Sequence, residues 1–432
     1  MSEEQAPTQS TPELLEFMYR LGQAYLACGE QTAQVELALR RVANSYSARK
    51  TRVVAFPTAI FITLHDSEGE KVTLAEGPLQ GLRLDQMADV YTLGAEAQRG
   101  GTPIGELQQR LTAILRQPMR FGWGGSIIGS TVLTAGIAMV LTPSLINIGA
   151  AAALGAVVGV LKTFMRERTL LSAPAPVVAA TIVSALVFAA VKYGLPIAPL
   201  KVLIPPLVTF LPGAMLTFGM IELAYGDMVS GTSRIMTGFV QLILLTFGIV
   251  AGAAIVGVTP GGLPDPVTPL DAVLWAPWLG ALIFGVGVFL HFSAPRNALP
   301  WMLLVILTAF AAQQATVGVV GKQFSGFFGM LLATPLGYLI QLRFKGPPAI
   351  VTFLPSFWLL VPGALSLMSV KTMLTDTTAG IDGLMTAVFV FASIALGTLM
   401  GASLYKWLTE RFGAWQLQVG RATRRARERQ KP

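Results

Sequence analysis

Two short segments of the sequence share the same spacing of prolines and glycine. Each follows the pattern Pro-x6-Pro-Gly-Ala, and the second copy begins 150 residues after the first. Proline lacks an amide donor and clashes with the preceding helical turn, so each copy should kink or break an apolar helix. A half-helix N-terminus favours a carboxylate, and freed carbonyls can take an ammonium group or a cation. The residues that would shape such a binding site are Pro205, Pro212 and Gly213 in the first copy and Pro355, Pro362 and Gly363 in the second.

Three ionisable residues, Glu222, Asp227 and Arg234, follow the first copy. A carboxylate in a membrane is costly unless it faces a cavity or a partner, so both acids are candidates for proton coupling, with Arg234 as an orienting partner. The alternative is an ordinary solvated Asp–Arg loop at the membrane surface. The charge pair is not duplicated, because the corresponding part of the second half holds Asp376, Asp382 and Leu384.

Hydrolytic chemistry has little support in the sequence. A thiol and an imidazole could form a nucleophile pair, and the residues available for it are Cys28, His65, Asp66 and Ser67. No nucleophile, base and orienting group can be assembled from their spacing, so we expect a core cysteine at a helix end and a histidine at a hairpin tip. One cysteine excludes an intrachain disulfide, and two histidines leave little for a histidine-rich metal site. We therefore predict no metal and no cofactor.

The composition predicts a membrane protein with a soluble N-terminal extension. Of 432 residues, 53% are hydrophobic and 12% are charged, against about 25% charged in soluble domains. This excludes a soluble globular protein, a disordered chain or a nucleic-acid binder as the whole molecule. The first 120 residues nevertheless carry 12 of the 31 Lys and Arg and 14 of the 23 Asp and Glu. The first ten residues are polar and show no signal peptide, so we expect the extension to stay in the cytoplasm.

The extension, residues 12–120, has the pattern of a small α/β domain. Apolar residues at helical spacing predict a first helix after Thr11 and a second over about 30–47. β-branched and aromatic residues over 52–74, with a turn at 66–69, predict strands. Two further helices are predicted over about 84–99 and 103–116, with Thr102 as the N-cap of the last.

The rest of the chain is predicted to cross the membrane about ten times, because a spanning helix needs about 20 mainly apolar residues. The expected spans are 123–141, 144–161, 175–191, 202–222, 235–258, 276–293, 299–320, 325–341, 348–370 and 384–405. The predicted organisation is a disordered N-terminus (1–11), the soluble domain (12–120), a first five-helix repeat (121–258), an extracytoplasmic loop (259–274), a second repeat (275–406) and a basic cytoplasmic tail (407–432).

An inverted repeat follows from a second match between the halves. Gly248-x3-Gly252 recurs as Gly397-x3-Gly401 at an offset of 149 residues, close to the offset of the proline motifs. Each half holds five spans, an odd number, so the second half must enter the membrane in the opposite sense, as in many secondary transporters. The bias of Lys and Arg among the loops predicts that both termini are cytoplasmic. For either copy of the proline motif, the alternative is a kink that serves only helix packing.

The chain resembles the threonine/serine exporter (ThrE) family of bacterial inner-membrane carriers from about Pro12 to Lys406. The resemblance is carried by the stretch 14–66, with Phe56-Pro-Thr-Ala-Ile-Phe-Ile62 at its centre, by Pro212-Gly-Ala-Met-Leu followed by Gly226-Asp-Met-Val-Ser-Gly231, and by Pro362-Gly363. It implies ten spans and export of small amino acids such as threonine and serine, driven by the proton-motive force. Some relatives are split into two polypeptides and are associated with small dicarboxylates such as succinate, whereas this chain has both parts fused.

The expected partners are a small solute (threonine, serine or a small organic acid), protons and the lipid bilayer, with no nucleic acid. A homo-oligomer is compatible with the sequence. Three alternatives to amino-acid export are a dicarboxylate exporter, a passive channel or scaffold and, least favoured, a membrane-anchored hydrolase. Ten spans are far more than a hydrolase would need as an anchor.

Overall fold

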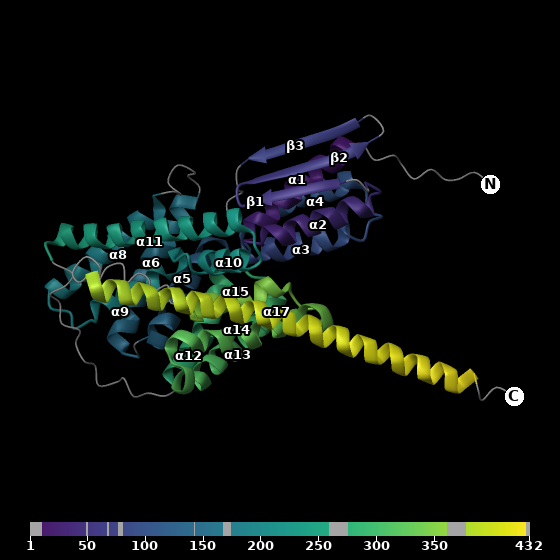
Figure 1. Cartoon of the computed structure of the whole chain (residues 1–432). Helices are drawn as coiled ribbons and strands as arrows, with labels where there is room; N and C mark the ends of the chain where they lie inside the picture. Colours follow the sequence, from purple (N-terminus) through teal and green to yellow (C-terminus); the bar gives the residue numbers. More distant parts are fainter. Residues whose placement is uncertain are drawn as a thin grey trace.

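The computed structural model describes residues 11–48, 51–66, 69–76, 81–141, 143–166, 174–258, 275–360 and 377–428. The N-terminal region contains four helices and three strands (Figure 1). In chain order these are α1 (Thr11–Ala27), α2 (Thr32–Ser45), β1 (Thr51–Phe56), β2 (Ala59–Asp66), β3 (Gly69–Glu76), α3 (Leu84–Ala97) and α4 (Ile104–Arg116). Thr102 does not cap α4, because Pro103 occupies the N-cap position and the Thr102 hydroxyl bonds to Glu96.

The three strands form an antiparallel meander with the order β1-β2-β3. Alternate residues of β1 and β2 are buried, including Val53, Ala55, Ile60 and Ile62, so one face of the sheet is apolar. Helix α1 packs on that face, and Gly22 permits the close approach because a Cβ at this position would lie 2.7 Å from the Ile60 side chain.

The chain is a multi-pass helical membrane protein. Within the described residues seven helices are long and apolar enough to cross a membrane, and a bent pair, Lys201–Phe210 with Gly213–Ala224, makes an eighth span. The membrane helices are α5 (Gly122–Leu141), α6 (Leu145–Arg166), α8 (Ala175–Lys192), α9 (Pro199–Leu207), α10 (Gly213–Ala224), α11 (Met228–Val256), α12 (Ala276–His291), α13 (Leu299–Val320), α14 (Lys322–Arg343), α15 (Ala349–Leu360) and α17 (Thr377–Glu428).

Each of the ten stretches expected from hydropathy contains a helix, but among the described residues only seven helices and the bent pair are long and apolar enough to span, and the remaining two helices are short. Helix α12 has 16 residues and α15 has 12, fewer than a perpendicular span needs. The continuation of α15, with the rest of the expected span 348–370, lies outside the described residues, as do the loop 259–274 and residues 1–10. Helix α17 extends to Glu428, so the expected tail begins as part of a 52-residue helix.

Helices α5 and α12, which begin the two predicted repeats, are in backbone contact. Gly129 and Gly136 on α5 face α12, and Gly280 and Gly287 on α12 face α5, in antiparallel order. A Cβ on any of the four would lie 3.0 Å or less from a backbone atom across the seam, so larger residues do not fit. A Cβ added at Gly129 would contact His291 N, and one at Gly136 would contact Phe284 N. A Cβ added at Gly280 would contact Val140 N, and one at Gly287 would contact Leu133 N.

A second kind of glycine contact occurs once in each half. Helix α11 lies parallel to α8, and α17 lies parallel to α14. A Cβ on Gly248 would lie 2.6 Å from Val177 O, and one on Gly401 would lie 3.1 Å from Leu331 O. Gly252 meets Thr181 O, and Gly397 meets Phe327 O, in the same way. The Gly-x3-Gly pairs are therefore helix-packing faces.

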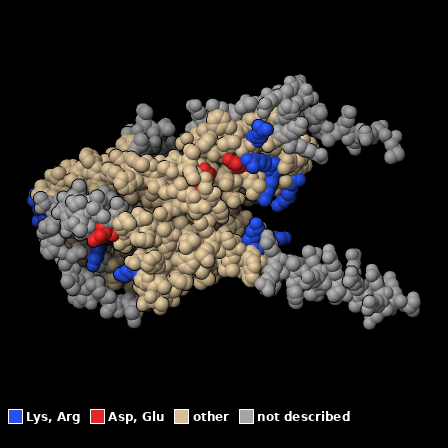
Figure 2. All heavy atoms as spheres, viewed as in Figure 1, with Lys and Arg blue, Asp and Glu red and all other residues tan. Residues whose placement is uncertain are grey.

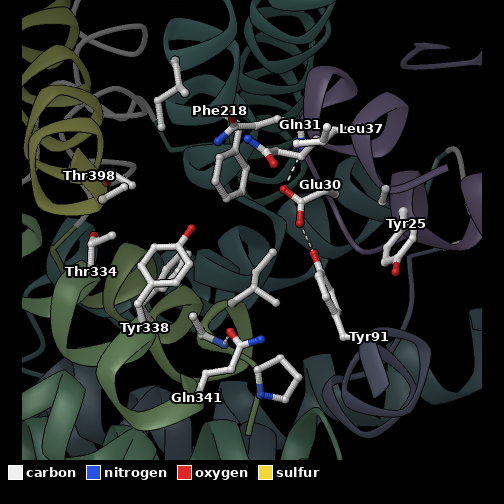
Figure 3. A pocket seen from close by; sticks show the side chains of 18 of the residues that line it. Tyr25, Glu30, Gln31, Leu37, Tyr91, Phe218, Thr334, Tyr338, Gln341 and Thr398 are labelled. Carbon is white, nitrogen blue, oxygen red and sulfur yellow. Dashed lines mark hydrogen bonds between the residues drawn. The ribbon is translucent and has the colours of Figure 1, made fainter. Parts of the chain in front are cut away.

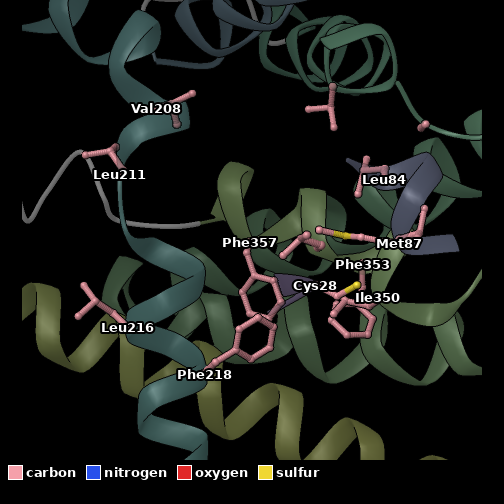
Figure 4. Packing of buried hydrophobic residues seen from close by; sticks show 14 of the residues in the cluster. Cys28, Leu84, Met87, Val208, Leu211, Leu216, Phe218, Ile350, Phe353 and Phe357 are labelled. Carbon is pink, nitrogen blue, oxygen red and sulfur yellow. The ribbon is translucent and has the colours of Figure 1, made fainter. Parts of the chain in front are cut away.

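The N-terminal region shares one apolar core with the membrane helices. Figure 4 shows Cys28 and Met87 beside Ile350 and Phe353 of α15, and Phe218 of α10 against Phe357, with ring centroids 5.4 Å apart. The Leu84 amide also donates to Phe292 O after α12 (3.1 Å). Figure 2 shows most described charges at the two ends of the membrane part, with an uncharged surface between them. That surface exposes large apolar residues, as a lipid-facing belt requires.

Candidate functional site

The first proline motif lies at a break in the fourth span. Helix α9 ends at Leu207, a 3₁₀ turn covers Val208–Phe210, and α10 begins at Gly213 after a bend of 58°. Pro205 lies in the last turn of α9, and Pro212 is the N-cap residue of α10. The expected break is therefore present at the motif, and Pro212 lies immediately before the new helix.

Polar side chains meet the backbone where the span breaks. The Gln241 amide of α11 donates to Phe210 O (2.7 Å) and thereby satisfies a carbonyl next to the break. The Lys162 ammonium of α6 donates to Thr209 Oγ1 (2.6 Å) and lies 4.4 Å from the centre of the Phe210 ring. No Asp or Glu in the described part of the chain forms an ion pair with Lys162. The break thus carries a lysine side chain that has no carboxylate partner among the described residues.

Lys162 makes a contact that the sequence did not predict, because the bias of Lys and Arg among the loops uses such a charge only to orient the protein. In the structure it is inside α6, and its ammonium reaches the broken span 47 residues further along the chain.

The second proline motif is only partly described. Pro355 lies within α15, which continues to Leu360 without interruption. Pro362 and Gly363 lie outside the described residues. The hydroxyl of the neighbouring Ser356 is fully buried and has no hydrogen-bond partner.

The three predicted ionisable residues come together at the far end of α10. Glu222 is 2% exposed and forms an ion pair with Arg234 on α11 (3.0 Å between Oε2 and Nε). Asp227 lies at the N-cap of α11 and is partly exposed. The Arg234 side chain is only 11% exposed, so it is not the solvated arginine of the Asp–Arg loop alternative, whereas Asp227 keeps partial exposure.

The N-terminal region closes over this cluster. Thr32, the first residue of α2, donates its amide to Glu222 Oε1 (3.1 Å), and its hydroxyl bonds to Asp227 and to Ser230 (3.2 Å). The positive end of a helix favours the carboxylates placed there. Arg234 in turn donates to the Glu30 backbone carbonyl (2.7 Å). These bonds connect residues about 200 positions apart and fix the N-terminal region to the broken span.

A cavity of about 500 Å³ lies beside this junction (Figure 3). One wall comes from the N-terminal helices, and the others come from α10, α14, α15 and α17. Glu30 lies on the N-terminal wall, where its carboxylate accepts hydrogen bonds from the Tyr91 hydroxyl and from the Gln31 amide (3.1 Å). Burial raises the pKa of Glu30, while these two hydrogen bonds and the Arg234 charge partly oppose the rise.

The cysteine is a core residue, as expected. Cys28 is 3% exposed, and burial raises the pKa of its thiol, with a further contribution from the Glu30 carboxylate. A protonated, buried thiol is a poor nucleophile. The side chains of His65 and Asp66, and the whole of Ser67, lie outside what the structure describes. The described residues hold no cluster of three His, Cys, Asp or Glu suited to a metal ion.

Four residues of the site were missed by sequence reasoning: Glu30, Thr32, Tyr91 and Lys162. Glu30 and Thr32 flank the start of α2, where polar residues are ordinary, and only the docking onto α10 gives them partners. A lysine 47 residues before Thr209 carried no signal of its contact with the proline motif.

These features define a class: a multi-pass membrane protein whose fourth span is broken, with buried charges at one end and a polar cavity beside it. Residues 16–256 match the family described as "Putative threonine/serine exporter" (ThrE), and the chain belongs to this family of membrane exporters. The match covers the N-terminal region from within α1 and ends at Val256, the last residue of α11.

A curated relative is the pheromone-regulated membrane protein 10 of the yeast Zygosaccharomyces rouxii. It is 26% identical over 215 residues, which are 45% of this chain and 21% of the relative. The matching segment thus spans about a fifth of the relative's length. No solved structure matches the chain.

Proposed function

We propose that the protein is a secondary active transporter that exports small amino acids, threonine and serine, by alternating access driven by the proton-motive force. The observation that carries the proposal is the broken span α9–α10. It places the Lys162 side chain and a helix N-terminus at one end of α10, and the buried Glu222–Arg234 pair at the other. Discontinuous helices of this kind form the substrate sites of many transporters.

Two five-helix halves related by a two-fold axis in the membrane plane form part of the proposal. Support comes from the α5–α12 seam, where Gly129 and Gly136 correspond to Gly280 and Gly287 at an offset of 151 residues. The contacts are reciprocal, because the residues that these glycines meet are related by the same offset: Leu133 to Phe284 and Val140 to His291. Such exchange of equivalent contacts is what a two-fold axis produces. The parallel pairs α8–α11 and α14–α17 repeat at offsets of 149–150 residues.

The substrate carboxylate would bind at the break, and Pro205, Pro212 and Gly213 would shape this end of the site. Lys162 supplies a cation, and the N-terminus of α10 supplies backbone amides. By the repeat, Pro355, Pro362 and Gly363 would shape the opposite side. Self-association into a homo-oligomer would leave this arrangement unchanged.

Proton coupling is assigned to Asp227 and Glu222, with Arg234 orienting the pair. Asp227 is the more exposed of the two acids and accepts a hydrogen bond from Thr32. Protonation of Asp227 would remove the negative charge at the start of α2 and weaken this bond. The N-terminal region would then be held less firmly against α10, which gives the proton a route to the conformational change.

Both termini are placed in the cytoplasm and the protein in the cytoplasmic membrane of a bacterium, as the loop charges and the resemblance favour. Export of a small dicarboxylate such as succinate is the second candidate. Lys162 favours it, because a lysine without a carboxylate partner among the described residues suits any carboxylate. The third candidate function is a passive channel or scaffold, and the least favoured is a membrane-anchored hydrolase.

The test is flux of labelled threonine, serine and succinate in proteoliposomes, with and without an imposed proton gradient. The proposal predicts saturable, gradient-dependent movement of threonine and serine. Gradient-dependent movement of succinate alone would select the dicarboxylate. Flux that ignores the gradient and does not saturate would indicate a channel and contradict the proposal.

A further inference from the structure

The cavity next to Glu30 has walls from both parts of the protein. Tyr25 and Tyr91 come from the N-terminal helices, whereas Phe218 comes from α10 and Tyr338 from α14 (Figure 3). Its volume of about 500 Å³ lies within the usual range of small-molecule sites. The cavity would accommodate a small solute together with some water, since one water occupies about 30 Å³.

Two charged residues line the N-terminal wall, Glu30 and the exposed Arg41, and the Glu30 carboxylate faces the cavity with capacity for a ligand. This carboxylate offers about four acceptor positions, and the Tyr91 hydroxyl and the Gln31 amide use two of them. Among the residues that the structure describes, no Lys or Arg side chain forms an ion pair with this carboxylate, because Arg234 binds the Glu30 backbone oxygen instead. A carboxylate in such a setting favours a cationic partner.

The opposite wall carries a polar group without a hydrogen-bond partner. Thr334 on α14 lines the cavity, is 1% exposed, and its hydroxyl makes no hydrogen bond. A buried polar group without a partner is unfavourable, so this hydroxyl is available to a ligand. Figure 3 shows Thr334 and Thr398 across the cavity from Glu30, with Tyr338 between the walls.

We propose that this cavity binds the amine-bearing solute on the cytoplasmic side, with the Glu30 carboxylate accepting its ammonium group and the Thr334 hydroxyl binding its polar end. The inference rests on the proposed export of small amino acids and deepens it. The N-terminal region is then a wall of the substrate site and supplies the group that selects amines. The site lies against α10, whose other end carries the break, so one helix links ammonium recognition to the carboxylate site at Lys162.

Binding to the full-length protein in nanodiscs tests the proposal. The probes are L-threonine, L-serine, ethanolamine (an amine without a carboxylate), 3-hydroxybutyrate (a carboxylate without an amine) and succinate. The variants are E30Q, which keeps the size and removes the charge, and T334V. The matched control is E106Q, which neutralises an exposed carboxylate of α4 away from the cavity.

Wild-type protein and E106Q should bind at least one of the three amines with the same affinity. E30Q should weaken that binding about 10- to 100-fold, the loss expected for a hydrogen bond to a charged group, and T334V should weaken it less. Binding of any probe without an amine should be unchanged in E30Q, and this together with an unchanged melting temperature excludes misfolding. Failure of all three amines to bind, or equal amine affinity in wild type and E30Q, would overturn the proposal.

Flux measurements separate this inference from the proposed function. Glu30-dependent binding without gradient-driven flux would contradict the transport mechanism and leave the amine site in place. Gradient-driven threonine flux with unchanged amine affinity in E30Q would support the transport mechanism and contradict the amine site.

Discussion

The two halves of the membrane part share their packing contacts but not their charges. The seams of α11 on α8 and of α17 on α14 use glycines at matching positions. At offsets of 150 residues, however, Glu222 corresponds to Thr372, Asp227 to Thr377, Arg234 to Leu384 and Lys162 to Ala312. The repeated glycines hold helices together, whereas the residues that are not repeated at these positions are charged. We infer that a common scaffold carries its chemistry in the first half, on the side where Thr32 and Glu30 dock.

The largest effect is expected at the break itself. Replacing Pro212-Gly213 with Ala-Ala should restore a continuous helix through α9 and α10 and abolish transport without loss of expression. P300A is the matched control, because Pro300 lies in the first turn of α13 and breaks no span. The measurement is flux in proteoliposomes at equal protein content, and full activity of the Ala-Ala variant would remove the break from the mechanism.

Removal of Arg234, which has no counterpart in the second half, should strongly lower the free energy of unfolding. R234A leaves Glu222 buried without its partner, and breaking a buried ion pair typically costs about 3–5 kcal/mol. The control is R110A, whose ion pair with Glu96 lies at the surface with side chains 41% and 30% exposed, and it should change the melting temperature little. Thermal unfolding in detergent compares the two. Equal melting temperatures for R234A and R110A would show that the cluster is not a structural link between the regions.

The shared scaffold predicts a symmetric response to overpacking. G136A and G287A each place a Cβ against the backbone of the opposite helix in the α5–α12 seam, so each should destabilise the protein by about 1–3 kcal/mol. The two losses should be similar if the two sites are related by the proposed repeat, since Gly287 lies 151 residues after Gly136. G318A is the control, since nothing lies within 4 Å of a Cβ there. A loss confined to one of the two seam variants would argue against two-fold symmetry.

The smallest effect concerns the cysteine beside the docking segment. Burial raises the pKa of the Cys28 thiol, so at pH 8 the folded protein holds less thiolate than free cysteine does, and the thiolate appears only at higher pH. Maleimide should therefore label native protein slowly and denatured protein fully. T32A, which removes two of the contacts at Asp227 and Ser230, should speed labelling if docking protects the thiol.

Sequence reasoning predicted the parts of this molecule that depend on local pattern. Hydropathy located a helix at every expected span, and the chemistry of Pro212 located the break. Helix α12 ends two residues before the end of the expected span 276–293, because the apolar run continues past the helix end, and the end of the expected span 348–370 lies outside the described residues. Contacts between distant residues were not predictable from one sequence. Thr32 meets Glu222 190 residues later, and Arg234 meets Glu30 across 204 residues.

The most direct test of the asymmetry is proton-driven threonine flux in D227N compared with D382N. Both variants neutralise one aspartate near the start of the last helix of a half, and Asp382 is exposed on α17. The account predicts that D227N loses its dependence on the proton gradient while D382N behaves as wild type. Normal gradient dependence in D227N, or its loss in D382N alone, would contradict the assignment of proton coupling to the first half.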